Sequence, residues 1–155
     1  MKSKDAHSNI EDFGEGLRFR RVIQDTNKNL VAPEKVKKVI FCSGQVFVDL
    51  EATREKTGRN DIAIVRVEQL CPFPFRSITP EIKKFKNAEV MWCQEEPQNQ
   101  GAYYYALPRL HNIMKSIGRT PEVSYAGRAI SASTSTGYGA VHEAELKKFL
   151  QEAMK

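Results

Sequence analysis

The chain has 155 residues, a length typical of one domain that buries a single hydrophobic core. Its formal net charge is +5, from 24 Lys plus Arg against 19 Asp plus Glu, and acids interrupt the basic residues along the chain. A nucleic-acid-binding protein gathers its cations in a continuous stripe with exposed aromatics, so this pattern argues against a nucleic-acid partner.

Cysteine and histidine usage gives no sign of a disulfide or metal framework. The 3 cysteines lack CxxC spacing, which indicates a reducing compartment, and His7, His111 and His142 have no mutual spacing that suits metal ligation. No apolar run approaches the ~20 residues that cross a bilayer, and the amino terminus lacks the apolar stretch of a signal peptide. We expect a soluble chain without a metal site or a membrane partner.

Little periodicity is present before residue 36. Residues 1–35 contain several Gly, Asn and Asp, so they are predicted to be an arm or connector whose one strand-like piece covers 17–23. Residues 36–155 alternate between two patterns and are predicted to form the folded domain. Strand-like runs occupy 36–42, 61–67, 88–93 and 122–126, and helical periodicity occupies 45–57, 99–117 and 140–154, with a further short helix from Pro80.

Glycine and proline mark the ends of these elements. Gly58 and Gly118 stand where helices commonly end in the left-handed conformation. Thr79 followed by Pro80 predicts an N-cap and the first helical residue. The two prolines within residues 71–75 indicate a rigid, extended connection.

Alternation of strands and helices requires crossover connections between the strands. Right-handed crossovers build a mostly parallel sheet that is covered by helices on both faces. We therefore predict an α/β fold of three layers, α/β/α, in which one short strand can run antiparallel at an edge of the sheet.

Two adjacent carboxylates, Glu95 and Glu96, follow the apolar run at 88–93, and α/β folds keep their functional groups at the carboxyl ends of strands. Neighbouring residues that leave a strand point in different directions, so the two need not share a substrate. The alternative to acid-base work is pairing with Arg109 or Arg128, or acceptance of amides at the amino end of the next helix. We favour this structural interpretation for at least one of the two.

Ser43 and Gly44 follow the first strand of the domain, where half of a phosphate-binding turn would stand. Neither a Walker loop nor a GxGxxG motif is present, so turn geometry alone is the competing interpretation. Together with Gln45 and Arg128, these residues form a candidate anion site at strand ends and a helix amino terminus.

Five motifs stand out along the chain: VIFCSG at 39–44, VEQLCPFPF at 67–75, WCQEE at 92–96 with NQG at 99–101, PRL at 108–110 and YAGR at 125–128. In this order they resemble the carboxy-terminal domain of 2-oxoglutarate dehydrogenases, and the resemblance runs from about residue 13 to the last residue. The wider pattern is similar to the third domain of transketolase-like enzymes, which is an α/β domain.

The resemblance implies a parent reaction, the oxidative decarboxylation of 2-oxoglutarate with transfer of the succinyl group to a lipoyl group. In the family this reaction uses thiamine diphosphate and magnesium, bound by a Gly-Asp-Gly motif that this sequence lacks. We therefore expect no catalytic, cofactor-binding or metal-binding residue in the chain, and no decarboxylase activity from the chain alone. The parent is expected in the mitochondrial matrix if eukaryotic and in the cytoplasm if bacterial.

Members of the family work as homodimers with active sites at subunit boundaries. The resemblance thus implies packing against the catalytic domains of the same chain and of a homodimer partner, within a complex that contains dihydrolipoyl succinyltransferase. Aromatic residues suit such an interface, although filling the domain's own core is the alternative for about half of them, Tyr103 included. The candidate interface residues are Phe73, Phe75, Glu95, Glu96, Gln100, Tyr104 and Tyr105.

A second hypothesis makes the domain a regulatory module. Ser43, Gly44, Gln45 and Arg128 would then hold a nucleotide or acyl-coenzyme A effector, as the resemblance to regulated members implies, although Gln45 is uncharged where some relatives carry a lysine. The related 2-oxoadipate-acting enzyme is an alternative parent, because substrate choice resides outside this domain. An unrelated freestanding enzyme has no constellation of residues in its favour.

Overall fold

The computed structural model describes residues 8–155, so residues 1–7 of the predicted arm, with His7, lie outside the described part. The segment before the domain holds two short 3-10 helices and a strand, η1 (Ile10–Phe13), β1 (Val22–Ile23) and η2 (Pro33–Lys35). Strands and helices then alternate as predicted, in the order β2 (Lys38–Cys42), α1 (Val46–Thr57), β3 (Ile62–Val67), α2 (Phe75–Lys84), β4 (Glu89–Pro97), α3 (Tyr103–Ser116), β5 (Val123–Arg128) and α4 (Gly139–Ala153).

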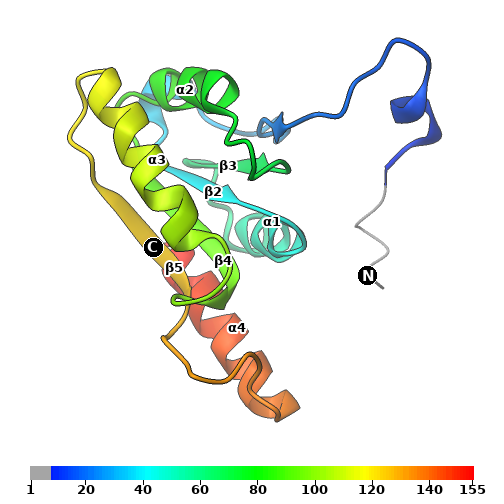
Figure 1. Cartoon of the computed structure of the whole chain (residues 1–155), viewed down its shortest axis with the longest axis vertical. Helices are drawn as coiled ribbons and strands as arrows, with labels where there is room; N and C mark the ends of the chain where they lie inside the picture. The colour runs from blue at the N-terminus through cyan, green and yellow to red at the C-terminus, as the bar shows by residue number, and fades with distance from the viewer. Residues whose placement is uncertain (1–7) are drawn as a thin grey trace.

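One sheet with the strand order β1-β3-β2-β4-β5 forms the middle layer. The four strands of the domain pair in parallel, and β1 pairs antiparallel with β3 at the edge. Figure 1 shows the helices on the two sides of this sheet and the amino-terminal segment running out beyond it. The predicted three-layer α/β fold with a short antiparallel edge strand is thereby confirmed.

Alternate residues of each strand face different helix layers, which divides the core in two. Phe41 and Trp92 pack with α2 and α3 on one face. Ile40 and Cys93 pack with α1 and α4 on the other. Burial raises the pKa of the Cys93 thiol to about 12, so this group stays protonated and packs as a small apolar side chain.

Helix α2 begins at Phe75, and the prediction of a helix start at Pro80 was wrong. Thr79 does not cap a helix, because its hydroxyl donates to the carbonyl of Phe75 (2.8 Å) within the first turn. Ile78 is fully buried and fixes that turn against the core. Pro80 lies inside α2, where its missing N–H leaves without a helical partner only the carbonyl of Arg76, an exposed residue of the first turn.

Strand β4 continues through Glu95 and Glu96 to Pro97, whereas the sequence predicted an end at residue 93. Pairing with β5 extends the strand, since Pro97 lies opposite Arg128 after an irregular step in the register. Helix α3 correspondingly begins at Tyr103 and not at residue 99. The intervening turn contains Gly101 with a φ of 63°, a conformation that glycine adopts without strain.

Two side chains that follow β1 attach the amino-terminal segment to both helix layers. Asp25 forms a fully buried ion pair with Arg54 of α1 and accepts the main-chain N–H of Ile64 in β3 (2.7 Å). Gln24 points the other way and donates to the carboxylate of Glu81 in α2 (2.5 Å). Removing one member of such a buried ion pair costs on the order of 3–5 kcal/mol, so part of the predicted arm is integral to the fold.

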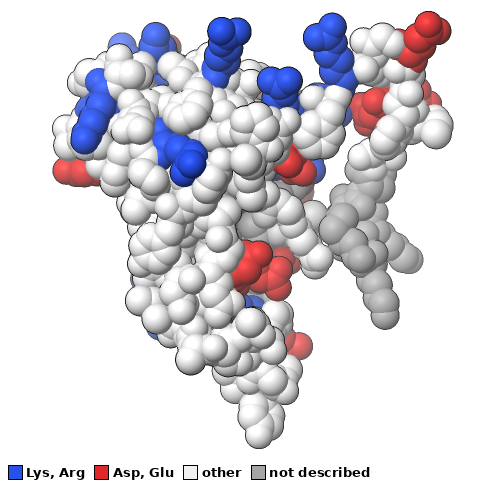
Figure 2. Space-filling model, in the orientation of Figure 1, with Lys and Arg blue, Asp and Glu red and all other residues white. Residues whose placement is uncertain are grey.

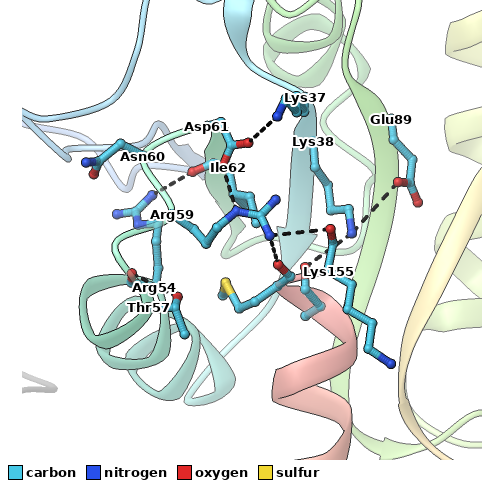
Figure 3. A network of polar contacts seen from close by, with 12 residues as sticks. Lys37, Lys38, Arg54, Thr57, Arg59, Asn60, Asp61, Ile62, Glu89 and Lys155 are labelled. Carbon is cyan, nitrogen blue, oxygen red and sulfur yellow. Dashed lines mark hydrogen bonds and ion pairs between the residues drawn. The ribbon is translucent and has the colours of Figure 1, made fainter.

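Basic side chains from the amino ends of the strands hold the end of α4, as Figure 3 shows. Arg59 donates to the main-chain oxygen of Met154, and Lys38 donates from Nζ to that of Ala153 (3.3 Å). Asp61 fixes Arg59 through a 2.8 Å hydrogen bond, and this hydrogen bond holds the pKa of the Asp61 carboxyl below its usual range. The last carbonyls of α4, which have no partner within the helix, are thereby satisfied by cations.

The buried carboxyl of Glu81 makes the stability of the fold depend on pH, and this dependence can be tested. The side chain is 2% exposed, its Oε2 has no hydrogen-bond partner, and burial raises the pKa of its carboxyl. A raised folded-state pKa means that the carboxyl favours folding below its unfolded pKa and loses this contribution as pH rises through the folded value.

The substitution Glu81→Gln removes the charge and keeps the acceptor for Gln24. We expect it to stabilise the fold by about 1 kcal/mol at neutral pH, and the gain to shrink as pH falls toward 4.5, the ordinary pKa of a glutamate. Thermal unfolding followed by circular dichroism across this pH range measures the effect, with the exposed Glu122→Gln as control. A change in stability that is the same at every pH would contradict the view that the buried charge of Glu81 destabilises the fold at neutral pH.

Candidate functional site

A buried amide, that of Gln94, organises the carboxyl end of the sheet. The side chain is 3% exposed, and its Oε1 accepts three N–H groups. These come from the indole of Trp92 (3.0 Å) and from the main chain of Ala102 (3.1 Å) and Tyr103 (2.8 Å). Gln94 therefore caps the amino end of α3, the role that the sequence had suggested for one of the two glutamates.

The other half of the same amide closes the turn between β4 and α3. Nε2 donates to the carbonyls of Pro97 (2.9 Å) and Gln100 (2.7 Å). A Cβ atom at Gly101 would lie 3.0 Å from this nitrogen, so the turn also needs glycine for space. Sequence reasoning missed Gln94, although its position two residues after Trp92 on the same face of the strand was a usable signal.

The main-chain oxygens of Glu95 and Glu96, not their carboxylates, stabilise the site. The carbonyl of Glu95 accepts from Arg128 Nε (3.0 Å), and that of Glu96 accepts from the Tyr125 hydroxyl (3.2 Å). Neither carboxylate pairs with Arg109, whose guanidinium stacks 3.5 Å from the ring centre of Tyr105. The predicted pairing of a Glu95 or Glu96 carboxylate with Arg109 or Arg128 was therefore wrong, and the Glu95 carboxylate lies instead 3.9 Å from Nε2 of His142.

Three aromatic residues at the carboxyl end of the sheet, Phe75, Tyr104 and Tyr105, are named here the aromatic surface, and Tyr105 also lines the first of two cavities there. Phe75 is 43% exposed and Tyr104 is 56% exposed. Phe73, predicted as an interface residue, is only 7% exposed, because it packs edge-on against Phe75 (5.2 Å between ring centres) and Tyr105 (6.3 Å). Tyr103 belongs to the core, as the sequence indicated.

The first cavity has a volume of about 400 Å³ and lies between the ends of β2 and β4. Its walls combine turn backbone, two aromatic side chains and the Gln94 amide. The lining residues are Ser43, Gly44, Leu70, Cys71, Trp92, Gln94, Glu96, Gly101, Ala102 and Tyr105.

The second cavity, of about 360 Å³, lies between the ends of β4 and β5, the loop at 129–138 and the start of α4. Arg128 lines this cavity. Its guanidinium donates to the Glu145 carboxylate (2.6 Å) and, from Nη2, to Nδ1 of His142 (3.0 Å). Glu95 and Glu96 also line it, so carboxylates outnumber the guanidinium. Burial and the neighbouring Glu95 raise the pKa of Asp49 nearby, as expected in an acidic environment.

The four residues of the candidate anion site do not lie together. Ser43 and Gly44 line the first cavity, Arg128 lines the second, and Gln45 is exposed and lines neither. Strand β4 stands between β2 and β5 in the sheet, which separates the two positions. The charge of Arg128 is also already matched by Glu145, so its guanidinium is not free for a phosphate.

Gln100, another predicted interface residue, holds the loop at 129–138 within the chain. Its Nε2 donates to the carbonyls of Ser131 (3.3 Å) and Ser133 (3.1 Å). Next to this loop the Tyr125 hydroxyl shares its one proton between the carbonyls of Arg128 (3.0 Å) and Glu96 (3.2 Å), and it lies 2.2 Å from where a Cβ atom at Gly127 would stand. The YAGR motif thus requires glycine because a tyrosine folds back over it.

Within residues 8–155, no group of three or more His, Cys, Asp or Glu side chains is placed to hold a metal ion. No helix in the same part of the chain has the length and apolar character needed to span a bilayer.

Comparisons with known proteins agree on one family. The family model described as 2-oxoglutarate dehydrogenase C-terminal matches residues 7–154. The chain is 43% identical over 152 residues to a Schizosaccharomyces pombe protein named 2-oxoglutarate dehydrogenase, mitochondrial, and 43% identical over 154 residues to the 2-oxoglutarate dehydrogenase E1 component of Cupriavidus necator. These matches cover 96% and 99% of this chain but 15% and 16% of the two relatives.

The Gln94 network predicts the effect of a nearly isosteric substitution. Gln94→Glu removes both N–H donors and sets a carboxylate against the carbonyls of Pro97 and Gln100. We expect a loss of about 3 kcal/mol in the free energy of unfolding, measured by chemical denaturation. Gln151→Glu, at an exposed position of α4, is the matched control, and equal effects of the two substitutions would refute the role of Gln94.

Proposed function

The chain belongs to the 2-oxoglutarate dehydrogenase C-terminal family, and we propose from this premise that it serves as the assembly domain of a longer 2-oxoglutarate dehydrogenase. The chain spans 15% of the length of the Schizosaccharomyces pombe relative. For the whole protein we propose the oxidative decarboxylation of 2-oxoglutarate with transfer of a succinyl group to a lipoyl group, dependent on thiamine diphosphate and magnesium.

The donor groups of this chain do not fit the proposed cofactor. The sequence contains no Gly-Asp-Gly motif, and the side chains of residues 8–155 offer no cluster suited to a metal ion. The polar groups at the carboxyl end of the sheet are engaged with one another, as the amide of Gln94 and the guanidinium of Arg128 illustrate. We therefore assign no step of the reaction to this chain.

The aromatic surface is the observation that supports an assembly role. Phe75 and Tyr104 expose large rings on helices whose backbones are fixed, and Arg109 stacks on the adjacent Tyr105. Rigid aromatic rings and arginine are enriched at interface centres, because they bury much area with little loss of conformational entropy. A contact with another protein surface would bury these rings, and this supports the proposed assembly role.

We infer that the partners of this surface are the catalytic domains of the same chain and of a second subunit in a homodimer. The complex would also contain dihydrolipoyl succinyltransferase, in the mitochondrial matrix of a eukaryote or in the cytoplasm of a bacterium. The relatives include proteins named as mitochondrial and a bacterial E1 component, which is compatible with either location. A parent that acts on 2-oxoadipate is the alternative, since the residues that choose the substrate lie outside this chain.

The purified chain alone should not turn over 2-oxoglutarate in the presence of thiamine diphosphate and magnesium. The measurement is reduction of an artificial electron acceptor, with the full-length protein as the positive control. Decarboxylation by the chain alone would disprove the proposal that its role is assembly.

Loss of the exposed rings should weaken assembly of the full-length protein. We expect Phe75→Ser combined with Tyr104→Ser to raise the dimer dissociation constant by at least about tenfold, because buried aromatic anchors each contribute roughly 1 kcal/mol or more. Sedimentation velocity over a concentration series measures the dissociation constant. Ile130→Ser, which removes an exposed apolar side chain outside this surface, is the control, and an unchanged dimer in the double variant would exclude the proposed interface.

A further inference from the structure

Lysines from three separate segments gather at the end of the molecule where the parallel strands begin. We name this surface the basic end and define it by Lys35 of η2, Lys83 and Lys84 in the last turn of α2, Lys86 after it, and Lys115 in the last turn of α3. All 5 side chains belong to exposed residues. Figure 2 shows Lys and Arg concentrated over the end that carries α2, whereas the opposite end is largely uncharged or acidic.

Hydrogen bonds lock these segments to one another. Arg119, just after α3, donates to the carbonyls of Ile82 (3.3 Å) and Ala88 (2.6 Å), which fixes the end of α3 beside the end of α2. Asn87 donates to the carbonyl of Glu34 (3.2 Å), which fixes η2 beside the loop after α2. The lysines therefore extend from a rigid common base although they are far apart in the sequence.

The ammonium groups of the basic end have no ionic partners within residues 8–155. No carboxylate oxygen lies within 4.0 Å of any of their Nζ atoms, whereas the neighbouring Lys37 pairs with Asp61 and Lys38 with Glu89. Glu81, the carboxylate of α2 itself, is buried and hydrogen bonded to Gln24, although the charge of Lys84 is near enough to oppose the rise in its pKa. The five lysines thus form no ion pair within the described part of the chain.

Stabilisation of helix ends does not account for the lysines. Cations near a helix carboxyl end do offset its dipole. At α2, however, the guanidinium of Arg119 already satisfies the terminal carbonyls from within the fold, and burial accordingly lowers the pKa of Arg119. Lys86 lies outside every helix, and Lys35 belongs to the single turn of η2, so the α-helices account for neither lysine.

We propose that the basic end docks an acidic segment of another polypeptide. Lysines that form no ion pair and extend from a common rigid base favour carboxylates by charge complementarity. Their long-range attraction also raises the rate of association. The large aromatic residue next to these lysines, Phe85, is fully buried, so the surface lacks the exposed rings on which nucleic-acid bases stack. The aromatic surface lies at the opposite, carboxyl end of the strands, so the two contacts are independent.

Charge reversal tests the proposal with a labelled poly-L-glutamate peptide as the probe. Lys83→Glu with Lys84→Glu should weaken binding by at least about tenfold in fluorescence anisotropy at low salt, and added salt should weaken the wild-type complex. The matched control is Lys147→Glu with Lys148→Glu, an exposed pair on α4 with the same change in net charge, which should alter binding less than about twofold.

Equal weakening by the two double variants would overturn the proposal, because binding would then follow net charge and not this surface. Tighter binding of a DNA oligonucleotide of equal charge than of poly-L-glutamate would also overturn it, in favour of a nucleic-acid partner. Circular dichroism should show that both variants remain folded, as expected for exposed lysines. Activity and dimer formation of the full-length protein should be unchanged, which separates this test from that of the assembly role.

Discussion

The amide of Gln94 is the interaction on which the carboxyl end of this domain depends. One side chain accepts from Trp92 in the core and from the first amides of α3, and it donates to the turn that leads there. A carboxamide can do this because it is donor and acceptor at once and carries no charge that burial would penalise. The positions of Tyr104 and Tyr105, and with them the exposed aromatic surface, follow from this cap.

A second constraint acts at the edge of the sheet that is formed by β3 and β1. Parallel strands leave an edge of unpaired backbone groups, which invites pairing with other chains. Residues 22–25 cover this edge of β3, and the buried pair of Asp25 with Arg54 and the contact of Gln24 with Glu81 hold them there. The domain thus includes residues that the sequence assigned to an arm. Its edge strand, β1, comes before the alternation of strands and helices that begins with β2.

The two ends of the domain differ in chemistry. At the carboxyl ends of the strands, aromatic rings surround one cavity and carboxylates dominate the other. At the amino ends, Lys38 and Arg59 donate to main-chain oxygens at the end of α4, whereas the lysines of the basic end form no ion pair within the described residues. This division places the proposed assembly contact and the proposed contact with an acidic segment at opposite ends of the domain.

The sequence by itself determined the α/β alternation and the helix ends at Gly58 and Gly118, because periodicity and glycine signals are local. The family followed separately, from the resemblance of the five motifs. Only the tertiary structure decided that Phe73 is buried, that Arg128 turns to Glu145 and away from Ser43, and that β4 runs on to Pro97. These outcomes depend on which strand lies next to which, and on partners distant in the sequence. A pattern of neighbouring residues carries no record of that order, so it placed Glu95, Glu96 and Arg128 near the carboxyl ends of the strands but did not predict the contacts made there.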